Sequence, residues 1–218
     1  MSIRLAVFDC DGTLSDGQAA VCEAMDIAFA EAGLPAPDRN RVRRIVGLSL
    51  HRAIPQLLPQ ESEERCADIV ENYKTAFRQA RLDGSLHEPL YDGIPELLRT
   101  LKSRGWLLGV ATGKSYRGLK STLATHGIGD LFQTLQTADS FPSKPHPAML
   151  EAALDDTLAR PENAVMIGDT VYDIEMARSI GVRALGVAWG YHEPEELLKA
   201  GAQAIAATPA DLENLING

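Results

Sequence analysis

Two aspartates, Asp9 and Asp11, follow directly on an apolar run near the start of the chain. The run at residues 3–8 is typical of a buried strand, and Gly12 and Thr13 after the aspartates favour a tight turn. Two carboxylates this close repel each other unless a cation or a reaction needs them. The stretch VFDCDGTLSD therefore indicates a site that binds a cation, does chemistry, or both.

Three later stretches also place polar residues at or just past the end of an apolar run. LLGVATGKS carries Thr112 and Gly113, FPSKPHPAML carries Lys144, and AVMIGDTVYDIEMA carries Asp169 and Asp173. The carboxyl ends of parallel strands form one edge of a sheet, where ligands bind. We therefore expect these residues to meet the two aspartates of the first strand, although they lie far apart in sequence.

The combined chemistry favours phosphoryl transfer. Carboxylate oxygens suit a hard cation such as Mg²⁺, and Thr112, the Gly113 backbone and Lys144 suit phosphate oxygens. An ionised aspartate can attack phosphorus and form an aspartyl-phosphate. A second carboxyl group can protonate the leaving alkoxide and then activate the water that hydrolyses the intermediate. Asp9 and Asp11 can divide those two roles.

The elements that position these residues alternate between apolar strands and amphipathic helices. Strands are predicted at 3–8, 106–111, 134–136, 164–167, 183–187 and 202–206. Helices are predicted between them at 94–104, 116–126, 146–154, 172–180 and 194–200. This alternation predicts an α/β fold with a Rossmann-like, doubly wound parallel sheet that is covered on both faces.

One segment departs from this alternation, because only helical patterns occur between residues 18 and 88. The patterns are found at 19–32, 39–46, 49–58 and 61–81. We predict an all-helical cap domain at 17–88, inserted into an α/β core domain made of 1–16 and 89–218. A lid hinged beside the end of the first strand can cover a site there.

Composition narrows the class of protein. The formal net charge of −9 disfavours a general nucleic-acid binder, which needs a basic face. No apolar run approaches the length of a membrane helix. The cysteine count of 3 is odd, with no metal-ligand spacing, which favours a reducing compartment. We expect a cytoplasmic protein, and the oligomeric state is left open.

The stretch FDCDGTLSD resembles motif I, DxDGT(L), of the haloacid dehalogenase superfamily. Thr112, Lys144 and the stretch GDTVYDIEMA match motifs II, III and IV of that family, in the same order. The helical insertion resembles the family's small C1 cap, and the chain is similar to the phosphoglycolate phosphatase-like branch. The resemblance covers nearly the full length and implies the family's Rossmann-like core.

The resemblance also implies a role for each carboxylate. Asp9 would be the nucleophile and a Mg²⁺ ligand, and Asp11 would be the general acid/base, with its backbone carbonyl on the metal. Asp169 would be the remaining direct protein ligand. Asp173 would lie just outside the direct ligands or contact a water on the metal, and it would also orient Lys144.

The phosphate-binding residues implied by the resemblance are Thr112, the Gly113 amide and Lys144. Many relatives carry an asparagine where this chain has Gly113. A backbone amide survives that exchange, so the difference bears on specificity more than on activity.

Other candidates have open or structural interpretations. Lys114 can approach the substrate or point to solvent, and the sequence does not decide between them. Cys10 should face away from the aspartates and pack in the core. His146, near a helix start, is interpreted as structural. A solvated helix face is favoured over substrate contact for three basic cap residues, Arg43, Arg44 and His51.

The leading functional hypothesis is a Mg²⁺-dependent phosphatase that hydrolyses a small phosphate monoester, phosphoglycolate-like or a sugar phosphate, through an aspartyl-phosphate on Asp9. The alternatives are a phosphomutase of the β-phosphoglucomutase type and, with less support, a pyrophosphatase. A non-enzymatic phospho-receiver is disfavoured, because receiver domains are shorter and carry no helical insertion. The leaving group is chosen by cap and loops, which the sequence does not resolve.

Overall fold

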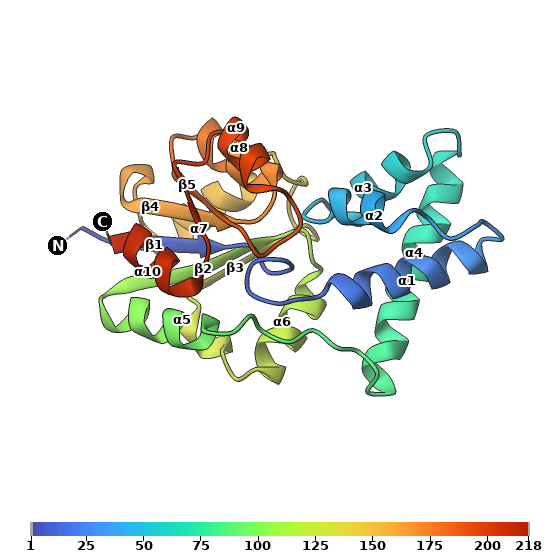
Figure 1. Cartoon of the computed structure of the whole chain (residues 1–218), viewed down its shortest axis with the longest axis horizontal. Coiled ribbons are helices and arrows are strands. Elements are labelled where there is room, and N and C mark those ends of the chain that lie inside the picture. Colours follow the sequence, from blue (N-terminus) through green and yellow to red (C-terminus); the bar gives the residue numbers. More distant parts are fainter. Residues whose placement is uncertain (1, 218) are drawn as a thin grey trace.

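In the computed structural model, which describes residues 2–217, a parallel sheet flanked by helices lies beside a separate group of helices (Figure 1). Within these residues the sheet has six strands in the order β3-β2-β1-β4-β5-β6. The strands are β1 (Arg4–Phe8), β2 (Trp106–Thr112), β3 (Thr134–Thr137), β4 (Ala164–Gly168), β5 (Arg183–Val187) and β6 (Ala204–Ala206). All neighbouring pairs are parallel. In this order β1 and β4 flank the point where the strand order reverses, and ligands of such sheets bind beside the carboxyl ends of the strands there.

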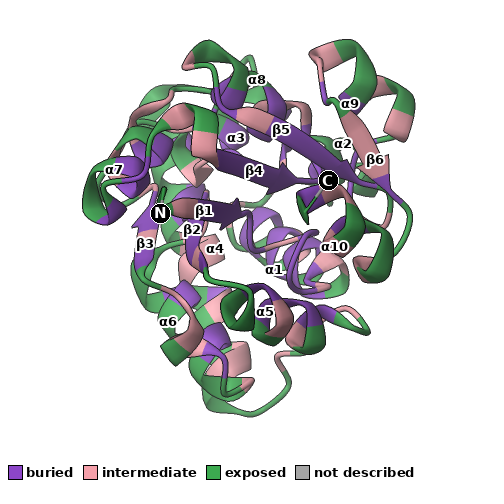
Figure 2. Cartoon of the chain, turned by 90° about the vertical axis from the view of Figure 1, so that its left-hand side faces the viewer, coloured by how far each residue is buried: buried purple, intermediate pink, exposed green. Residues whose placement is uncertain are grey.

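The alternation of side chains along β1 creates two apolar layers. Leu5 and Val7 belong to one buried cluster, whereas Ala6 and Phe8 belong to the other. The first cluster is completed by α7 (Ala148–Thr157), α8 (Val171–Ser179) and α9 (Pro194–Ala200). The second is completed by α5 (Ile94–Ser103), α6 (Tyr116–Thr125) and α10 (Pro209–Asn217). Figure 2 shows the central strands buried and the outer helix faces exposed, so the predicted doubly wound α/β fold is confirmed.

The observed bounds differ from the predicted ranges by one to three residues at several element ends, and one helix was not expected. Helix α7 begins at Ala148 rather than 146, because Pro147 occupies its N-cap position. Strand β6 begins at Ala204 rather than 202, after the left-handed Gly201 that ends α9. Helix α10 was not predicted. Two features of the sequence indicate this helix: Thr208 is a favourable N-cap residue, and Leu212 and Ile216 follow four residues apart. In the structure the Thr208 hydroxyl accepts a hydrogen bond from the Asp211 amide, and both apolar side chains are buried.

The helices inserted between β1 and α5 form their own layer. They are α1 (Gln18–Glu31), α2 (Arg39–Ile45), α3 (Leu50–Leu57) and α4 (Glu63–Leu82), and α1 packs along α4 (Figure 1). Apolar side chains from all of them share one buried cluster, separate from the two clusters of the sheet. The domain limits of 17 and 88 stay a prediction. None of the described helices combines the length and apolar character needed to cross a membrane.

Polar contacts join this helical layer to the carboxyl edge of the sheet. The Arg44 guanidinium pairs with Glu196, with 2.6 Å between Nη2 and Oε1. The Arg44 carbonyl accepts a hydrogen bond from the Tyr172 hydroxyl at 3.2 Å. The Ser49 amide donates to the Ser143 hydroxyl at 2.8 Å. The helices therefore lie over the edge at which the predicted site residues end their strands.

Candidate active site

Asp9 continues β1 by one residue, at the carboxyl end of the strand and next to β4. Its amide donates to the Ile167 carbonyl at 2.9 Å, which extends the ladder to β4, and its side chain is buried. The turn that follows depends on Gly12, which has a φ of 88°. A Cβ at that position would lie 2.2 Å from Asp169 Oδ2. Glycine therefore lets the turn approach the carboxylate that follows β4.

Lys144 is fully buried between two carboxylates. Its Nζ lies 3.0 Å from Asp9 Oδ1 and 2.6 Å from Asp173 Oδ1. Asp173 is held in turn by Thr170, whose amide and hydroxyl donate to Asp173 Oδ2 at 3.1 and 2.7 Å. A buried ammonium is tolerated when carboxylates and hydrogen bonds compensate its lost hydration. The loop before α7 thus delivers its lysine beside the end of β1.

Asp169, the residue after β4, is also fully buried and fixed on both sides. Its Oδ1 accepts from the Thr13 hydroxyl at 2.6 Å, and its Oδ2 accepts from the Tyr191 amide at 2.9 Å. Thr13 belongs to the turn after β1 and Tyr191 to the loop after β5. Three neighbouring strands thereby fix the orientation of this one carboxylate.

The carboxylates form a group that fits a divalent cation. One oxygen each of Asp9, Asp169 and Asp173 lie within 4.8 Å of one another. Both oxygens of Asp173 accept hydrogen bonds, whereas Asp9 Oδ2 is buried without a donor among residues 2–217. A buried anionic oxygen without a partner is costly, and carboxylate oxygens are the ligands that Mg²⁺ prefers. The donor set therefore fits Mg²⁺, with a free ligand atom on Asp9.

The electrostatics of this group agree with that fit. Burial raises the pKa of Asp9 to about 7, Lys144 opposes the rise, and Asp173 adds to it. Burial and the neighbouring Asp9 likewise raise the pKa of Asp169 well above its ordinary value. Burial alone would lower the pKa of Lys144, but Asp173 and Asp9 raise it, so the ammonium stays charged. One ammonium faces more carboxylates than it can neutralise, and a divalent cation would remove the excess.

Thr112 and Gly113 lie at the end of β2, where the helical layer comes closest. Thr112 is buried, and its hydroxyl accepts from the Lys114 amide at 3.2 Å. A Cβ on Gly113 would lie 2.7 Å from the backbone carbonyl oxygens of both Gly47 and Leu48, between α2 and α3. Glycine therefore lets this loop rest on the end of β2. Any larger residue at this position, asparagine included, would force this loop to move.

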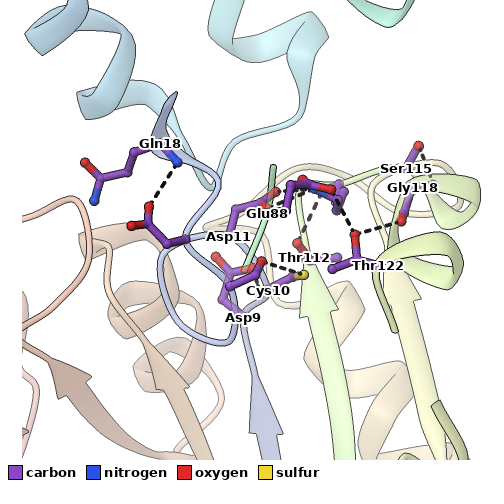
Figure 3. Close-up of polar contacts among 12 residues, drawn as sticks. Asp9, Cys10, Asp11, Gln18, Glu88, Thr112, Ser115, Gly118 and Thr122 are labelled. Carbon is purple, nitrogen blue, oxygen red and sulfur yellow. Dashed lines mark hydrogen bonds and ion pairs between the residues drawn. The ribbon is translucent and has the colours of Figure 1, made fainter. Parts of the chain in front are cut away.

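The Lys114 side chain links Asp11 to Glu88, which lies in the connection from α4 back to the sheet. Its Nζ lies 2.9 Å from Asp11 Oδ1, 3.1 Å from Oδ2, and 2.6 Å from Glu88 Oε1. Figure 3 shows Asp9, Asp11 and Thr112 side by side, with Glu88 reaching across to Thr122. Of the two interpretations left open for Lys114, the inward one is observed. Glu88 was missed, because it belongs to no motif and precedes the predicted resumption of the α/β pattern by one residue.

A cavity of about 380 Å³ separates the sheet from the helical layer. Asp9, Asp11 and Thr112 line it from the sheet side. Apolar and aromatic side chains line it from the helical side: Val21, Met25, Val42, Ile45, Tyr73 and Phe77. A chamber with reactive polar groups on one wall and apolar groups on the other is typical of a small-molecule site.

Basic side chains also line this cavity. Among the basic cap residues considered from sequence, His51 lines it, Arg44 pairs with Glu196 instead, and Arg43 is outside the lining. Four further basic residues on the wall were missed: Lys74, Arg78, Arg81 and Arg117. The first three recur at helical spacing on α4, which places them on one face of that helix but does not say what the face covers.

Two residues beside the motifs have structural surroundings. Cys10 is buried in the apolar cluster that contains Phe8, with its Sγ 3.8 Å from Ser15 Oγ. His146 is exposed, and its Nδ1 accepts a hydrogen bond from the Ala148 amide at the start of α7. Both contacts agree with the structural interpretations of these residues.

Comparisons with known proteins place the chain in a family. Residues 6–187 match the family model described as haloacid dehalogenase-like hydrolase. The probable phosphatase IndB of Dickeya dadantii is 34% identical over 94% of this chain and 89% of its own length. The phosphoglycolate phosphatase of Nitrosococcus oceani is 30% identical over 98% of this chain and 96% of its own length. The crystal structure of a predicted phosphatase from Clostridium acetobutylicum matches with a TM-score of 0.89 and 25% identity, over 100% of this chain and 99% of that one. The chain belongs to the haloacid dehalogenase-like hydrolase family.

Proposed function

We propose that this hydrolase is a Mg²⁺-dependent phosphatase that cleaves a small phosphate monoester through an aspartyl-phosphate on Asp9. The observation that carries the proposal is the environment of Asp9. Asp9 lines the cavity, its carboxylate contacts the buried Lys144, and one of its buried oxygens has no donor within the described part of the chain. A carboxylate so placed can serve as a metal ligand and as a nucleophile. Relatives named as phosphatases support the same reaction class.

The residues that would hold Mg²⁺ are the carboxylates of Asp9 and Asp169 and the backbone carbonyl of Asp11. When bound, the ion would neutralise the excess carboxylate charge and polarise the phosphoryl oxygens. Asp173 would not be a direct ligand; it would hold Lys144 in place and contact water around the ion. Thr112 and the Gly113 amide would hold the remaining phosphoryl oxygens, together with the Lys144 ammonium.

In the first step an Asp9 oxygen attacks phosphorus, and the bond from phosphorus to the ester oxygen breaks. Asp11, in its protonated form, gives its proton to the departing alkoxide, so an alcohol leaves and Asp9 carries the phosphoryl group. In the second step the Asp11 carboxylate takes a proton from water, which attacks the same phosphorus. The bond from phosphorus to Asp9 breaks, and inorganic phosphate leaves with both aspartates restored.

Residues 17–88 would act as the cap that closes this reaction off from bulk water. The cavity they cover has room for a leaving group of the size of glycolate or a sugar. A relative named phosphoglycolate phosphatase supports this substrate class. We therefore favour a phosphoglycolate-like or sugar phosphate ester, released as the free alcohol.

Phosphate release should require Mg²⁺. With a panel of 2-phosphoglycolate, sugar phosphates and pyrophosphate, we expect turnover with Mg²⁺ and loss of turnover with EDTA, because the excess carboxylate charge then repels the phosphate. Release of phosphate is measured by a colorimetric assay, and products are separated by chromatography. An isomerised sugar phosphate in place of free phosphate would favour the mutase alternative. Turnover that persists in EDTA would contradict the proposal.

Gly113→Ala should lower kcat/KM by about tenfold or more, because a misplacement near 1 Å is costly in a closed site. The added Cβ would meet the carbonyl oxygens of Gly47 and Leu48, and the loop between α2 and α3 would have to withdraw. The matched control is Gly129→Ala, whose Cβ would have Leu123 as its nearest neighbour, at 3.9 Å. Wild-type kcat/KM in Gly113→Ala would show that the loop does not need this contact.

A further inference from the structure

Asp11 is held by a buried ion-pair cluster that the proposed reaction does not by itself require. The Lys114 ammonium contacts both Asp11 oxygens and also Glu88 Oε1, at 2.6 to 3.1 Å. The side chains of Lys114, Asp11 and Glu88 are 8%, 14% and 6% exposed. Ion pairs this well shielded hold their geometry far better than surface pairs do.

Each member of the cluster comes from a different part of the fold. Asp11 follows β1, Lys114 follows β2, and Glu88 lies where the chain returns from α4 to the sheet. Glu88 is fixed further: its Oε2 accepts from the Thr122 hydroxyl at 3.3 Å and lies 3.6 Å from Arg81 Nη2. The position of Glu88 is thereby set by α6 on one side and α4 on the other.

The helical layer contacts this cluster at two places, through Phe77 on α4 and through Gly17 in the connection from β1 to α1. The Lys114 ammonium lies 5.3 Å from the centre of the Phe77 ring on α4. A Cβ on Gly17, just before α1, would lie 3.2 Å from Asp11 Oδ1 and 3.7 Å from Glu88 Oε1. Both connections of the helical layer therefore pass beside this cluster, so movement of that layer acts on the groups that hold Asp11.

We propose that Lys114 and Glu88 are positioning residues, which aim the Asp11 carboxyl group at the ester oxygen when the cap is in place. In this structure the Lys114 ammonium contacts both oxygens of Asp11. When Asp11 carries its proton, one oxygen would stay on Lys114 and the other would direct its O–H at the ester oxygen. Glu88 holds Lys114 in place from the connection that returns from α4. The inference rests on the proposed function, because Asp11 matters as a proton donor in the first step. It adds a second group of residues, outside the family motifs named above, to the determinants of that step.

The test compares two esters of nearly equal size, 4-nitrophenyl phosphate and 4-nitrobenzyl phosphate. Nitrophenolate is a weak base and leaves without a proton, whereas the benzyl alkoxide needs one from Asp11. Release of the leaving group is followed in a single turnover with enzyme in excess, which isolates the first step from hydrolysis of the aspartyl-phosphate. The variants are Lys114→Met, Lys114→Arg and Glu88→Gln, with the exposed Lys120→Met as control.

For Lys114→Met we expect the benzyl ester to react about 100-fold more slowly while the phenyl ester changes by less than about threefold. Glu88→Gln should show the same selective loss, and Lys114→Arg should restore most of the rate because it keeps the ion pair. In Asp11→Asn, adding Lys114→Met should cause little further loss, since both changes act on one group. Lys120→Met should behave as wild type.

An equal loss of rate with both esters in Lys114→Met and Glu88→Gln would overturn the inference, because a structural defect slows the reaction of both esters alike. Weaker binding of both esters, seen as a higher enzyme concentration for the half-maximal single-turnover rate and without the selective loss, would overturn it too, since Lys114 would then bind the phosphate. If Lys114→Met does not fold, as judged by circular dichroism, Glu88→Gln decides the question. The proposed function is tested separately, by wild-type turnover of the phenyl ester and its loss in Asp9→Asn.

Discussion

Asp9→Asn is expected to reduce phosphate release by about 10⁴-fold or more, because the amide cannot attack phosphorus as a carboxylate does. The loss should appear in kcat for every substrate of the panel, since the first step is common to all of them. The side chain keeps its size, and the Asp9 amide still donates to the Ile167 carbonyl, so the strand end should remain in place.

The control is Asp130→Asn, an exposed aspartate outside the cavity lining, which should retain wild-type turnover. Both variants are assayed with Mg²⁺ at saturating substrate, and folding is checked by circular dichroism. Turnover of Asp9→Asn within tenfold of wild type (roughly 1.4 kcal/mol in activation free energy) would remove Asp9 as the nucleophile.

The same variant should be more stable than wild type when Mg²⁺ is absent, and increasingly so as the pH rises from about 4 to 8. In the folded protein the pKa of Asp9 is raised to about 7, above its ordinary value of 3.8. The folded state therefore binds this proton more tightly than the unfolded chain, and the stabilisation is lost as the pH rises through 7. Thermal unfolding in EDTA at several pH values measures the difference, and a difference independent of pH would contradict the sign.

Lys144→Met should lower the free energy of unfolding by about 3 to 5 kcal/mol, which is typical when one partner of a buried ion pair is removed. Asp9 and Asp173 would then face each other without the ammonium that lies 3.0 and 2.6 Å from them. Phosphate release should fall as well, because Lys144 would no longer contact the nucleophile or the phosphate. Urea unfolding at fixed pH, with and without Mg²⁺, measures the stability change.

The matched control for that change is Lys120→Met, on the exposed side of α6, which should shift the free energy of unfolding by less than about 0.5 kcal/mol. In the double variant Asp9→Asn/Lys144→Met part of the stability should return, since one uncompensated carboxylate is gone. Strictly additive effects of the two substitutions would indicate that Lys144 does not act on Asp9.

The sheet and the ends of its strands were largely predictable from sequence. A fully buried parallel strand must be apolar on both faces, so β1 and β4 appear as continuous apolar runs with sharp polar ends. Asp9 and Asp169 are the residues directly after these runs, and the parallel topology brings both to the carboxyl edge of the sheet. The buried position of Lys144 did not follow in the same way, because a loop lysine between prolines has the same sequence whether it is solvated or enclosed.

The parts of the site that come from the helical layer were less predictable. Periodicity predicts that α4 is a helix, but not that Arg78 and Phe77 line the cavity, because that depends on how the layer is placed over the sheet. Glu88 lies in a connection without a pattern of its own. Gly113 departs from the motif in sequence, but the reason for glycine there, the backbone of Gly47 and Leu48 resting on it, depends on how the helical layer lies over the end of β2.

The most direct test of the central claim is to detect the aspartyl-phosphate itself. Asp11→Asn should still be phosphorylated by an activated ester such as 4-nitrophenyl phosphate, but should hydrolyse the intermediate slowly, because no carboxylate activates the water. The variant is mixed with this ester and Mg²⁺, quenched in acid, and analysed by intact-mass and peptide mass spectrometry. We predict an added mass of one phosphoryl group on the peptide that contains Asp9, absent in EDTA and absent when Asp9→Asn is also present. Turnover without any phosphorylated enzyme, or a phosphoryl group on a different residue, would contradict the account.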